Sequence, residues 1–241
     1  MSEDYFEAVS KSQNPIYHYK EPTRQGGVQG ISHIEQITDH IEKYIGPIEM
    51  VYHEIASELV HLDVHYIKAT DTFPFHTLVT SGMSDLSMVV PNEDVPPYLE
   101  LCVHLPEYWQ LDNESLKDEQ WYWPVRMLKF AARFPHQYQT FLGYGHTVSN
   151  GNPPEPFHES LGFNGFILLP SVIVADDFFT LDINEKKQIQ FLSVVPIYEE
   201  EMTLKLRKGC DALTDQFDKH SYNGIIDPDR KNFAKKRFGI F

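Results

Sequence analysis

Residues 61–83, HLDVHYIKATDTFPFHTLVTSGM, contain two strand-like segments separated by a short connection. In 61–69 and in 76–83, β-branched and aromatic residues recur with a period near two, and turn-forming residues bound each segment. The segments IEMVYHEI (48–55) and YLELCVHL (98–105) have the same pattern on either side. Connections this short favour antiparallel neighbours, because a parallel pair needs a long crossover. The sequence therefore predicts antiparallel strands through this part of the chain.

A helix is expected directly before these strands. One apolar face is formed by the isoleucines at positions 34, 37, 41 and 45, and Gly46-Pro47 ends the pattern. Ser32 and Glu35 have the spacing of a capping box, in which two side chains satisfy N-terminal amides that have no partner inside the helix. The pattern predicts a helix that begins at Ser32.

Two further helical regions follow the strands. Pro124 suits the first turn of a helix, where its missing N–H is not needed, and Pro135 is expected to end that helix. Its core face holds Val125, Leu128 and Ala131. After Pro196, apolar residues recur at positions 198, 202, 206, 210, 213 and 217, and Gly209 bends or divides this stretch. Glu199, Glu200 and Glu201 are expected to form its solvated first turn, where negative charge suits the helix dipole.

The order of these elements predicts the fold class. FILLPSVIV (166–174) and KQIQFLSVVPI (187–197) have the composition of buried strands. Strands followed by helices mixed with more strands predict an α+β fold, a mixed and mostly antiparallel twisted sheet with helices packed against it. No repeat or low-complexity linker divides the chain. We expect an irregular N-terminal arm over 1–31, one domain over 32–229 and a basic tail over 230–241.

The charge of the chain bears on its partners. Its net charge is −15, from 20 basic and 35 acidic residues. Such a field disfavours nucleic acid and favours basic partners. The tail, RKNFAKKRFGIF, has five lysines and arginines and no acid, which leaves −20 for residues 1–229. We expect this tail to be solvated or to pair with the acidic surface of the same chain; a nucleic-acid-binding arm is the alternative.

Cysteine usage and apolar runs bear on the compartment. The N-terminus lacks the pattern of a secretory signal, and no run approaches the roughly 18 apolar residues of a membrane helix. Cys102 and Cys210 make a poor disulfide framework for 241 residues, so buried reduced thiols are expected. These features predict a cytoplasmic protein that does not bind membranes.

Two segments resemble catalytic or nucleotide-binding motifs, but each lacks a residue that the motif requires. LGYGHTVSNGNP (142–153) lacks the lysine of a phosphate-binding loop, and Val148 stands where a dinucleotide fingerprint needs its third glycine. LVTSGMSDL (78–86) has Leu86 in place of the second glycine of a nucleophile elbow. We therefore expect Ser84 and Asp85 to bond nearby backbone amides in a turn. No cofactor is predicted.

A metal site is the alternative chemical interpretation. In a strand over 61–69, His61, Asp63 and His65 share one face, and imidazole and carboxylate groups are ligands for zinc or iron. Such a site would make the chain a metal-dependent hydrolase or a metal-binding protein. The simpler interpretation is that Leu62, Val64 and Tyr66 face the core and the polar face meets water. The acidic clusters at 176–177 and 199–201 satisfy no spacing rule for acid–base catalysis. The aromatic residues at 121–123 are expected in the core or an interface.

Several segments together resemble the suppressor of fused family. The residues that carry the resemblance are TLVTSGMSDLSM (77–88), YWPVRMLKFAARFP (122–135), LGYGHTVSNG (142–151), FLSVVPIYEEEM (191–202), GCDALTDQF (209–217) and DPDR (227–230). They occur in one order, and the resemblance as a whole runs from about residue 30 to residue 232. This order is far more specific than any one segment.

The resemblance implies a mixed α/β domain that binds proteins and does not catalyse a reaction. Animal members hold a zinc-finger transcription factor with the help of a second domain, and this chain ends where that domain would begin. Short members that stand alone resemble bacterial proteins, some of them proposed as immunity proteins that neutralise a toxin. The partner implied here is a protein, and a basic toxin suits the negative charge. Asp85, Arg126, His146 and Thr147 lie in the family-like segments and are the predicted partner-binding residues. The alternative is that Asp85, Arg126 and His146 belong to the internal scaffold and that His146 and Thr147 hold the loop 142–151 by hydrogen bonds.

Overall fold

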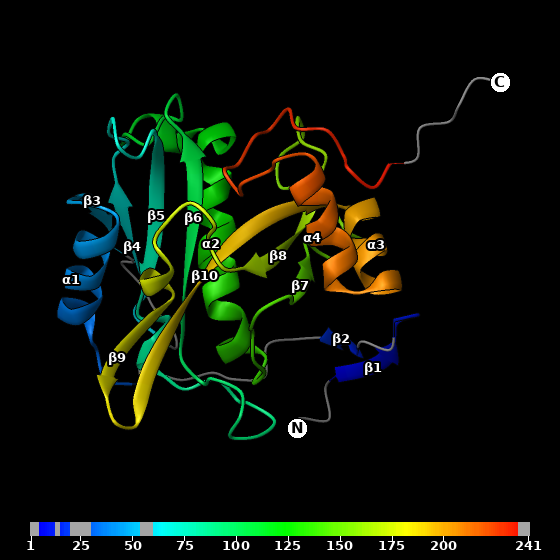
Figure 1. Ribbon diagram of the computed structural model, residues 1–241, viewed down its shortest axis with the longest axis horizontal. Coiled ribbons are helices and arrows are strands. Elements are labelled where there is room, and N and C mark those ends of the chain that lie inside the picture. Colours follow the sequence, from blue (N-terminus) through cyan, green and yellow to red (C-terminus); the bar gives the residue numbers. More distant parts are fainter. Residues whose placement is uncertain (1–4, 13–14, 20–29, 54–59, 236–241) are drawn as a thin grey trace.

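The computed structural model describes residues 5–12, 15–19, 30–53 and 60–235. The largest feature of these residues is an open eight-stranded sheet, shown in Figure 1. Its path is β3-β4-β5-β6-β10-β8-β7, and β9 pairs with β10 beside this path. The strands are β3 (Ile48–Tyr52), β4 (Asp63–Ile67), β5 (Phe75–Ser81), β6 (Leu99–Pro106), β7 (Thr147–Ser149), β8 (Phe163–Leu169), β9 (Thr180–Asn184) and β10 (Lys187–Tyr198).

The pairing confirms the predicted fold class. The β6–β10 pair is parallel, and the six other pairs of this sheet are antiparallel. The four predicted strands 48–55, 61–69, 76–83 and 98–105 correspond to β3 to β6 in order, although residues 54 and 55 lie outside the described residues. The predicted strand 166–174 begins earlier, at Phe163, and ends at Leu169. The fold is a mixed, mostly antiparallel sheet with helices packed against it.

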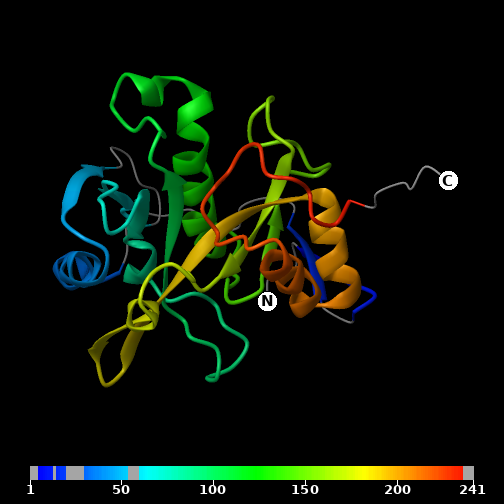
Figure 2. The same cartoon turned by 45° about the horizontal axis from the view of Figure 1, so that its top comes forward.

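Helices cover both faces of the sheet. In the described part of the chain they are α1 (Ile34–Tyr44), α2 (Glu119–Gln137), α3 (Glu199–Lys208) and α4 (Cys210–Lys219). Figure 2 shows α2 in green on one side of the sheet and α4 in orange on the other. Successive residues of β5 show the same division: Leu78 belongs to the apolar cluster of α2, and Val79 belongs to that of α1. A third cluster joins α4 to β8 and β10 through Leu213 and Phe217.

The capping box predicted for the first helix is wrong. The helix begins one residue beyond His33, and no side chain caps it. The reason lies elsewhere in the chain, because the Asp85 carboxylate accepts the His33 N–H and the Asp85 carbonyl accepts the Ile31 N–H. A distant residue thus bonds the two amides on either side of Ser32. Of the predicted apolar face, the isoleucines at 37, 41 and 45 are buried, whereas Ile34 is exposed.

The boundaries predicted from two prolines are also wrong. Helix α2 begins at Glu119, where Asp118 accepts the Gln120 N–H at 2.9 Å, so Pro124 lies inside the helix. Pro135 also lies inside, two residues before the end. A proline removes only the bond to the carbonyl four residues earlier, and here the long buried face of α2 keeps the helix continuous. That face includes the predicted core residues Val125, Leu128 and Ala131, together with Trp123.

The segments before and after the main sheet are more ordered than the sequence suggested. The predicted irregular arm contains a hairpin of β1 (Tyr5–Val9) and β2 (Pro15–Tyr19). Ser12 Oγ donates to the Leu206 carbonyl at 2.8 Å, and the Tyr19 hydroxyl donates to Thr140 Oγ1 at 2.7 Å. After α4, Ile226 donates its N–H to the His104 carbonyl at 2.8 Å. None of the described helices combines the length and apolar composition of a membrane span.

Candidate functional site

The turn after β5 is built around a buried carboxylate. Gly82 has φ +101°, and the short helix η1 (Met83–Asp85) follows it. Glu100 of β6 is fully buried and accepts from the Ser84 N–H at 2.9 Å and from Ser84 Oγ at 2.7 Å. Its other oxygen accepts from Thr80 Oγ1 at 2.6 Å. Ser84 is thus a donor to a carboxylate, which agrees with the rejection of a nucleophile elbow. The prediction that its side chain bonds nearby backbone amides is wrong, because the hydroxyl donates to Glu100.

Two further charged groups complete this cluster. Lys187 Nζ donates to the Ser84 carbonyl at 2.8 Å, and Asp85 holds the entry to α1. Burial raises the pKa of Glu100 to about 7 and that of Asp85 to about 6, whereas burial lowers the pKa of Lys187. Shifts of this kind often mark active sites, but structural networks of buried charges produce them too. Because both oxygens of Glu100 are occupied by the protein, the cluster favours a structural role.

Glu100 makes a testable contribution to stability. The folded protein holds its proton more tightly than the unfolded chain, so the stabilisation is complete below pH about 4.5 and is lost as the pH rises through about 7. The loss amounts to about 3 kcal/mol of unfolding free energy. The free energy of unfolding of Glu100→Gln, measured in urea, should not show this loss. The difference in unfolding free energy between the variant and the parent should therefore change across that pH range. Glu49→Gln, on an exposed glutamate of β3, is the control. A constant difference between Glu100→Gln and the parent would contradict the assignment.

A serine–histidine pair lies beside a small apolar cavity. Ser171 lines this cavity of about 230 Å³, and His104 Nε2 lies 2.9 Å from its Oγ. The other ring nitrogen contacts Thr77 Oγ1 at 3.1 Å, where a hydrolase places a carboxylate. Burial lowers the pKa of His104 to about 4, which makes the imidazole a weak base at neutral pH. The pair therefore does not favour hydrolysis.

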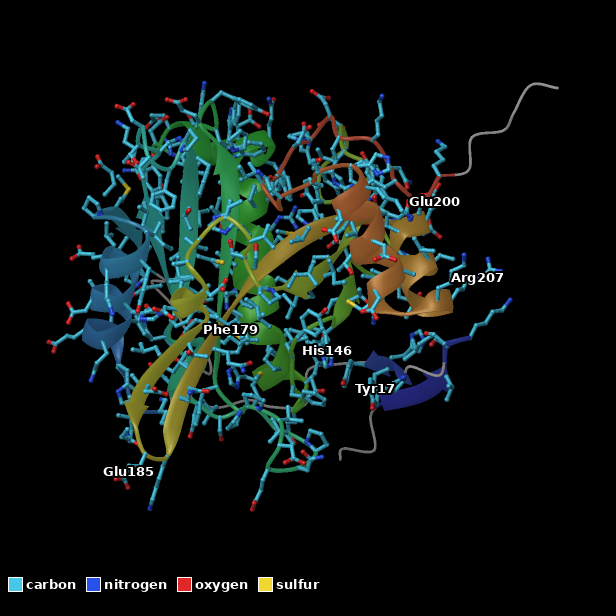
Figure 3. The ribbon with its side chains drawn as sticks, viewed as in Figure 1. Tyr17, His146, Phe179, Glu185, Glu200 and Arg207 are labelled. Atoms are coloured by element: carbon cyan, nitrogen blue, oxygen red, sulfur yellow. The ribbon has the colours of Figure 1, made fainter. Side chains whose placement is uncertain are left out.

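The loop before β7 places His146 where internal contacts hold it. Gly145 has φ +74°, and its N–H donates to the Leu168 carbonyl at 2.8 Å. Burial lowers the pKa of His146, whose ring bonds the Phe141 backbone and lies 5.0 Å from the Phe141 ring. Figure 3 labels His146 where the chain enters β7. These contacts hold the His146 ring against Phe141, within the fold.

Strand β7 offers backbone groups at the edge of the sheet. The Asn150 N–H donates to the Asn164 carbonyl, and the Leu168 N–H donates to the His146 carbonyl. The backbone hydrogen-bonding groups at positions 146, 148 and 150 therefore point toward β8. By the alternation of an antiparallel ladder, the N–H groups of Thr147 and Ser149 point away from β8. No described strand pairs with β7 on that side. Nearby, Tyr144 is 57% exposed.

Arg126 lies apart from both of these regions. Its Nε donates to Glu119 Oε1 at 2.5 Å, and a terminal nitrogen donates to the Phe157 carbonyl at 2.6 Å. The guanidinium therefore fastens α2 to the loop before β8. Of the four predicted partner-binding residues, Asp85, Arg126 and His146 hold internal contacts, and Thr147 presents its backbone at an edge.

The predicted metal set His61, Asp63 and His65 is not the set that the fold brings together. His65 Nε2 bonds Ser81 Oγ at 2.8 Å, and His53 of the neighbouring chain segment contacts Asp63 in its place. The expectation that this face of the strand meets water is also wrong, because Asp63 and His65 are both buried. Helix α1 and its apolar cluster cover that face of the sheet. The hydrolase interpretation gains no support from this arrangement.

Sequence reasoning missed one buried ion pair. Glu201 was expected in a solvated helix start, but it is fully buried and bonds Arg230 at 2.6 Å. Arg230 was assigned to the tail and is buried as well. Glu100 and Lys187 were also overlooked. The available signal for Glu100 was a lone acid in the otherwise apolar strand YLELCVHL.

Comparisons with known proteins agree with this fold. The family model described as "Suppressor of fused protein (SUFU)" matches residues 58–231. Comparison with curated proteins finds no match. A crystal structure of a SUFU homologue from Neisseria gonorrhoeae superposes with a TM-score of 0.61 at 15% identity, covering 84% of this chain and 97% of that one.

Two further solved structures share the fold. A crystal structure of a Sufu–Fu complex has a TM-score of 0.59 at 13% identity, covering 85% of this chain and 93% of that one. Drosophila Suppressor of Fused gives 0.55 at 12% identity, covering 84% of this chain and 50% of that one. At these identities the structures show the shared fold, and the family model, which matches most of the chain, shows the kinship. The chain belongs to the suppressor of fused family.

Proposed function

We propose that this chain is a non-enzymatic protein-binding domain that docks its partner on the edge of β7. The observation that carries the proposal is the family match over residues 58–231, together with a neighbour of the same fold that was solved as a complex of two proteins, Sufu and Fu. The groups that could have formed a catalytic site support it, because Ser84, Glu100 and His104 hold contacts within the fold.

The edge of β7 suits an extended peptide. The N–H and C=O of Thr147 and the N–H of Ser149 have no partner among the described residues, and such groups are the template for strand addition. Tyr144, three residues before Thr147, adds exposed aromatic surface to this region. Aromatic side chains are enriched where interfaces have their strongest contacts.

The charge of the chain supports a basic partner. A net charge of −15 accelerates encounter with basic proteins, and this effect weakens with salt. A basic toxin fits this description, in which case the chain acts as an immunity protein. Co-expression with the captured partner separates the two roles, since an immunity protein restores the growth of cells that make its toxin, and a binding domain without that role leaves growth unchanged.

A single substitution tests the docking edge. After capture from the source organism and identification by mass spectrometry, the purified partner is titrated against the parent, Thr147→Pro and Thr147→Val. Proline removes the outward N–H. We expect the affinity for the partner to fall at least about tenfold, because one hydrogen bond to the partner and the close packing around it are lost. Valine keeps the N–H and the strand propensity, and its affinity should match the parent.

Thermal unfolding of the same variants is the control for folding. The Thr147 N–H is not bonded within the described sheet, so the melting temperature of Thr147→Pro should stay close to that of the parent. Equal affinity for proline and parent would remove the β7 edge from the proposal. Failure to capture any protein at any salt concentration would contradict protein binding itself.

A further inference from the structure

We propose that His53, His61 and Asp63 form a binding site for one divalent transition-metal ion, of which zinc is the best fit. This site is separate from the docking edge, because β4 lies beside the edge strand β3 and β7 lies at the other end of the sheet. It also differs from the set predicted from the strand alone, because His53 replaces His65.

The three side chains converge on one point. Asp63 Oδ1 lies 3.0 Å from His53 Nδ1 and 3.4 Å from His61 Nε2, and the three ligand atoms all lie within 4.8 Å of one another. In a tetrahedral zinc site, bonds of about 2.0–2.2 Å place neighbouring ligand atoms about 3.3 Å apart. The distance from Asp63 to His61 is already close to this value, and the ligand atoms that lie up to 4.8 Å apart would approach one another around the ion.

The chemistry of the set suits a metal with open positions. Asp63 is buried with only 4% of its side chain exposed, and the two imidazoles cover its carboxylate from the solvent side. A buried carboxylate needs compensating positive charge, which a divalent ion supplies. His53 and His61 are 66% and 50% exposed, so an ion held by them remains open to water. Two histidines and one carboxylate are typical ligands of zinc and of non-haem iron.

The backbone keeps the set in place from two sides. Asp63 begins β4 and pairs with Ser81 of β5, so the carboxylate is fixed to the core of the sheet. His53 directly follows β3, which pairs with β4 through Tyr52 and Val64. His53 therefore approaches the carboxylate from the neighbouring strand, and His61 lies two residues before Asp63 in the same segment, so the sheet fixes where the ligands meet.

Metal titration of the full chain, expressed without a histidine tag and stripped with chelator, tests the site. We expect isothermal titration with zinc chloride to give one ion per chain, and cobalt chloride to give the visible absorption bands of a tetrahedral complex. His53→Ala and His61→Ala should each weaken zinc binding at least about tenfold, since even neighbours of metal ligands contribute that much. His158→Ala, on the loop before β8, is the matched control and should bind as the parent does.

Thermal unfolding distinguishes the loss of a metal-binding side chain from a loss of folded structure in the variants. Both histidines are half-exposed or more, so their alanine variants should melt with the parent in metal-free buffer, and only the parent and His158→Ala should gain stability with added zinc. Asp63→Asn is the third ligand variant. Zinc binding that survives the removal of both histidines, or a parent that binds no zinc, would overturn the proposal and leave the three residues as an imidazole–carboxylate cluster.

Discussion

Replacing Arg230 by alanine is expected to lower the free energy of unfolding by about 3–5 kcal/mol, the range for breaking a buried ion pair from one side. The two terminal nitrogens of Arg230 donate to the two oxygens of Glu201 at 2.7 and 2.6 Å, and one of them also donates to the Pro196 carbonyl at 2.9 Å. Side-chain exposure is 3% for the arginine and 0% for the glutamate. Alanine would leave the Glu201 carboxylate buried without its cation.

The surroundings of Arg230 make the guanidinium shape as important as its charge. Its central carbon lies within 5.8 Å of the centres of five aromatic rings, those of Phe163, Tyr198, Phe217, Tyr222 and Phe233. A planar guanidinium stacks on such rings and forms two parallel bonds to one carboxylate, which an ammonium group does not. We therefore expect Arg230→Lys to retain only part of the stability.

Chemical denaturation with urea measures these differences. The neighbouring Lys231→Ala removes an exposed positive charge and should change stability by less than about 0.5 kcal/mol. Replacing both partners, as in Glu201→Leu with Arg230→Met, should cost less than Arg230→Ala alone, because no charge is then left buried without a partner. If Arg230→Ala and Lys231→Ala unfold at the same urea concentration, the ion pair does not hold the end of the chain.

The sequence predicted those features that depend on near neighbours. Period-two patterns placed β4, β5 and β6 within two residues of their observed ends, because alternation reports directly which residues are buried. Gly209 was expected to bend or divide the last helical stretch, and α3 and α4 meet there. The family resemblance, carried by segments in one order, is confirmed by the family model.

Features that depend on distant partners were not accessible in the same way. Lys187 reaches the carbonyl of Ser84 across 103 positions, and Asp85 accepts the N–H of His33, some fifty residues earlier in the chain, directly before α1. In the metal set, the period of a single strand favoured His65, whereas the pairing of β3 with β4 brought His53 to Asp63. Local sequence patterns indicate whether a residue is buried, but they do not indicate which group it contacts.

Catalytic motifs depend on local sequence, so the absence of a required residue from such a motif was informative. The missing glycine at Leu86 argued against a nucleophile elbow, and the structure commits Ser84 to Glu100. The template did not reveal why the first glycine of that segment, Gly82, is required. That reason is a close approach of two backbone segments, which the folded structure shows.

Substituting Gly82 by alanine is expected to destabilise the fold by about 3 kcal/mol or more. Gly82 has φ +101°, a left-handed conformation that costs an alanine about 1 kcal/mol or more. A Cβ atom at this position would overlap the His61 carbonyl oxygen, which belongs to the backbone and cannot rotate away. Forcing the two segments apart adds about 1–3 kcal/mol of strain in a packed core.

Two other glycines separate the two contributions. Gly209 has φ +96° and ψ 171°, a conformation found almost only in glycine, and no neighbouring atom lies within 4 Å of the position that a Cβ would take. Gly209→Ala should therefore show the backbone cost alone, about 1–3 kcal/mol. Gly143 has neither a positive φ nor a near neighbour, and Gly143→Ala should be close to neutral. The three unfolding midpoints in urea should therefore fall in the order Gly143→Ala, Gly209→Ala, Gly82→Ala. A Gly82→Ala protein as stable as Gly209→Ala would mean that β4 and the turn after β5 move apart freely, and that the contact with the His61 carbonyl does not constrain the fold.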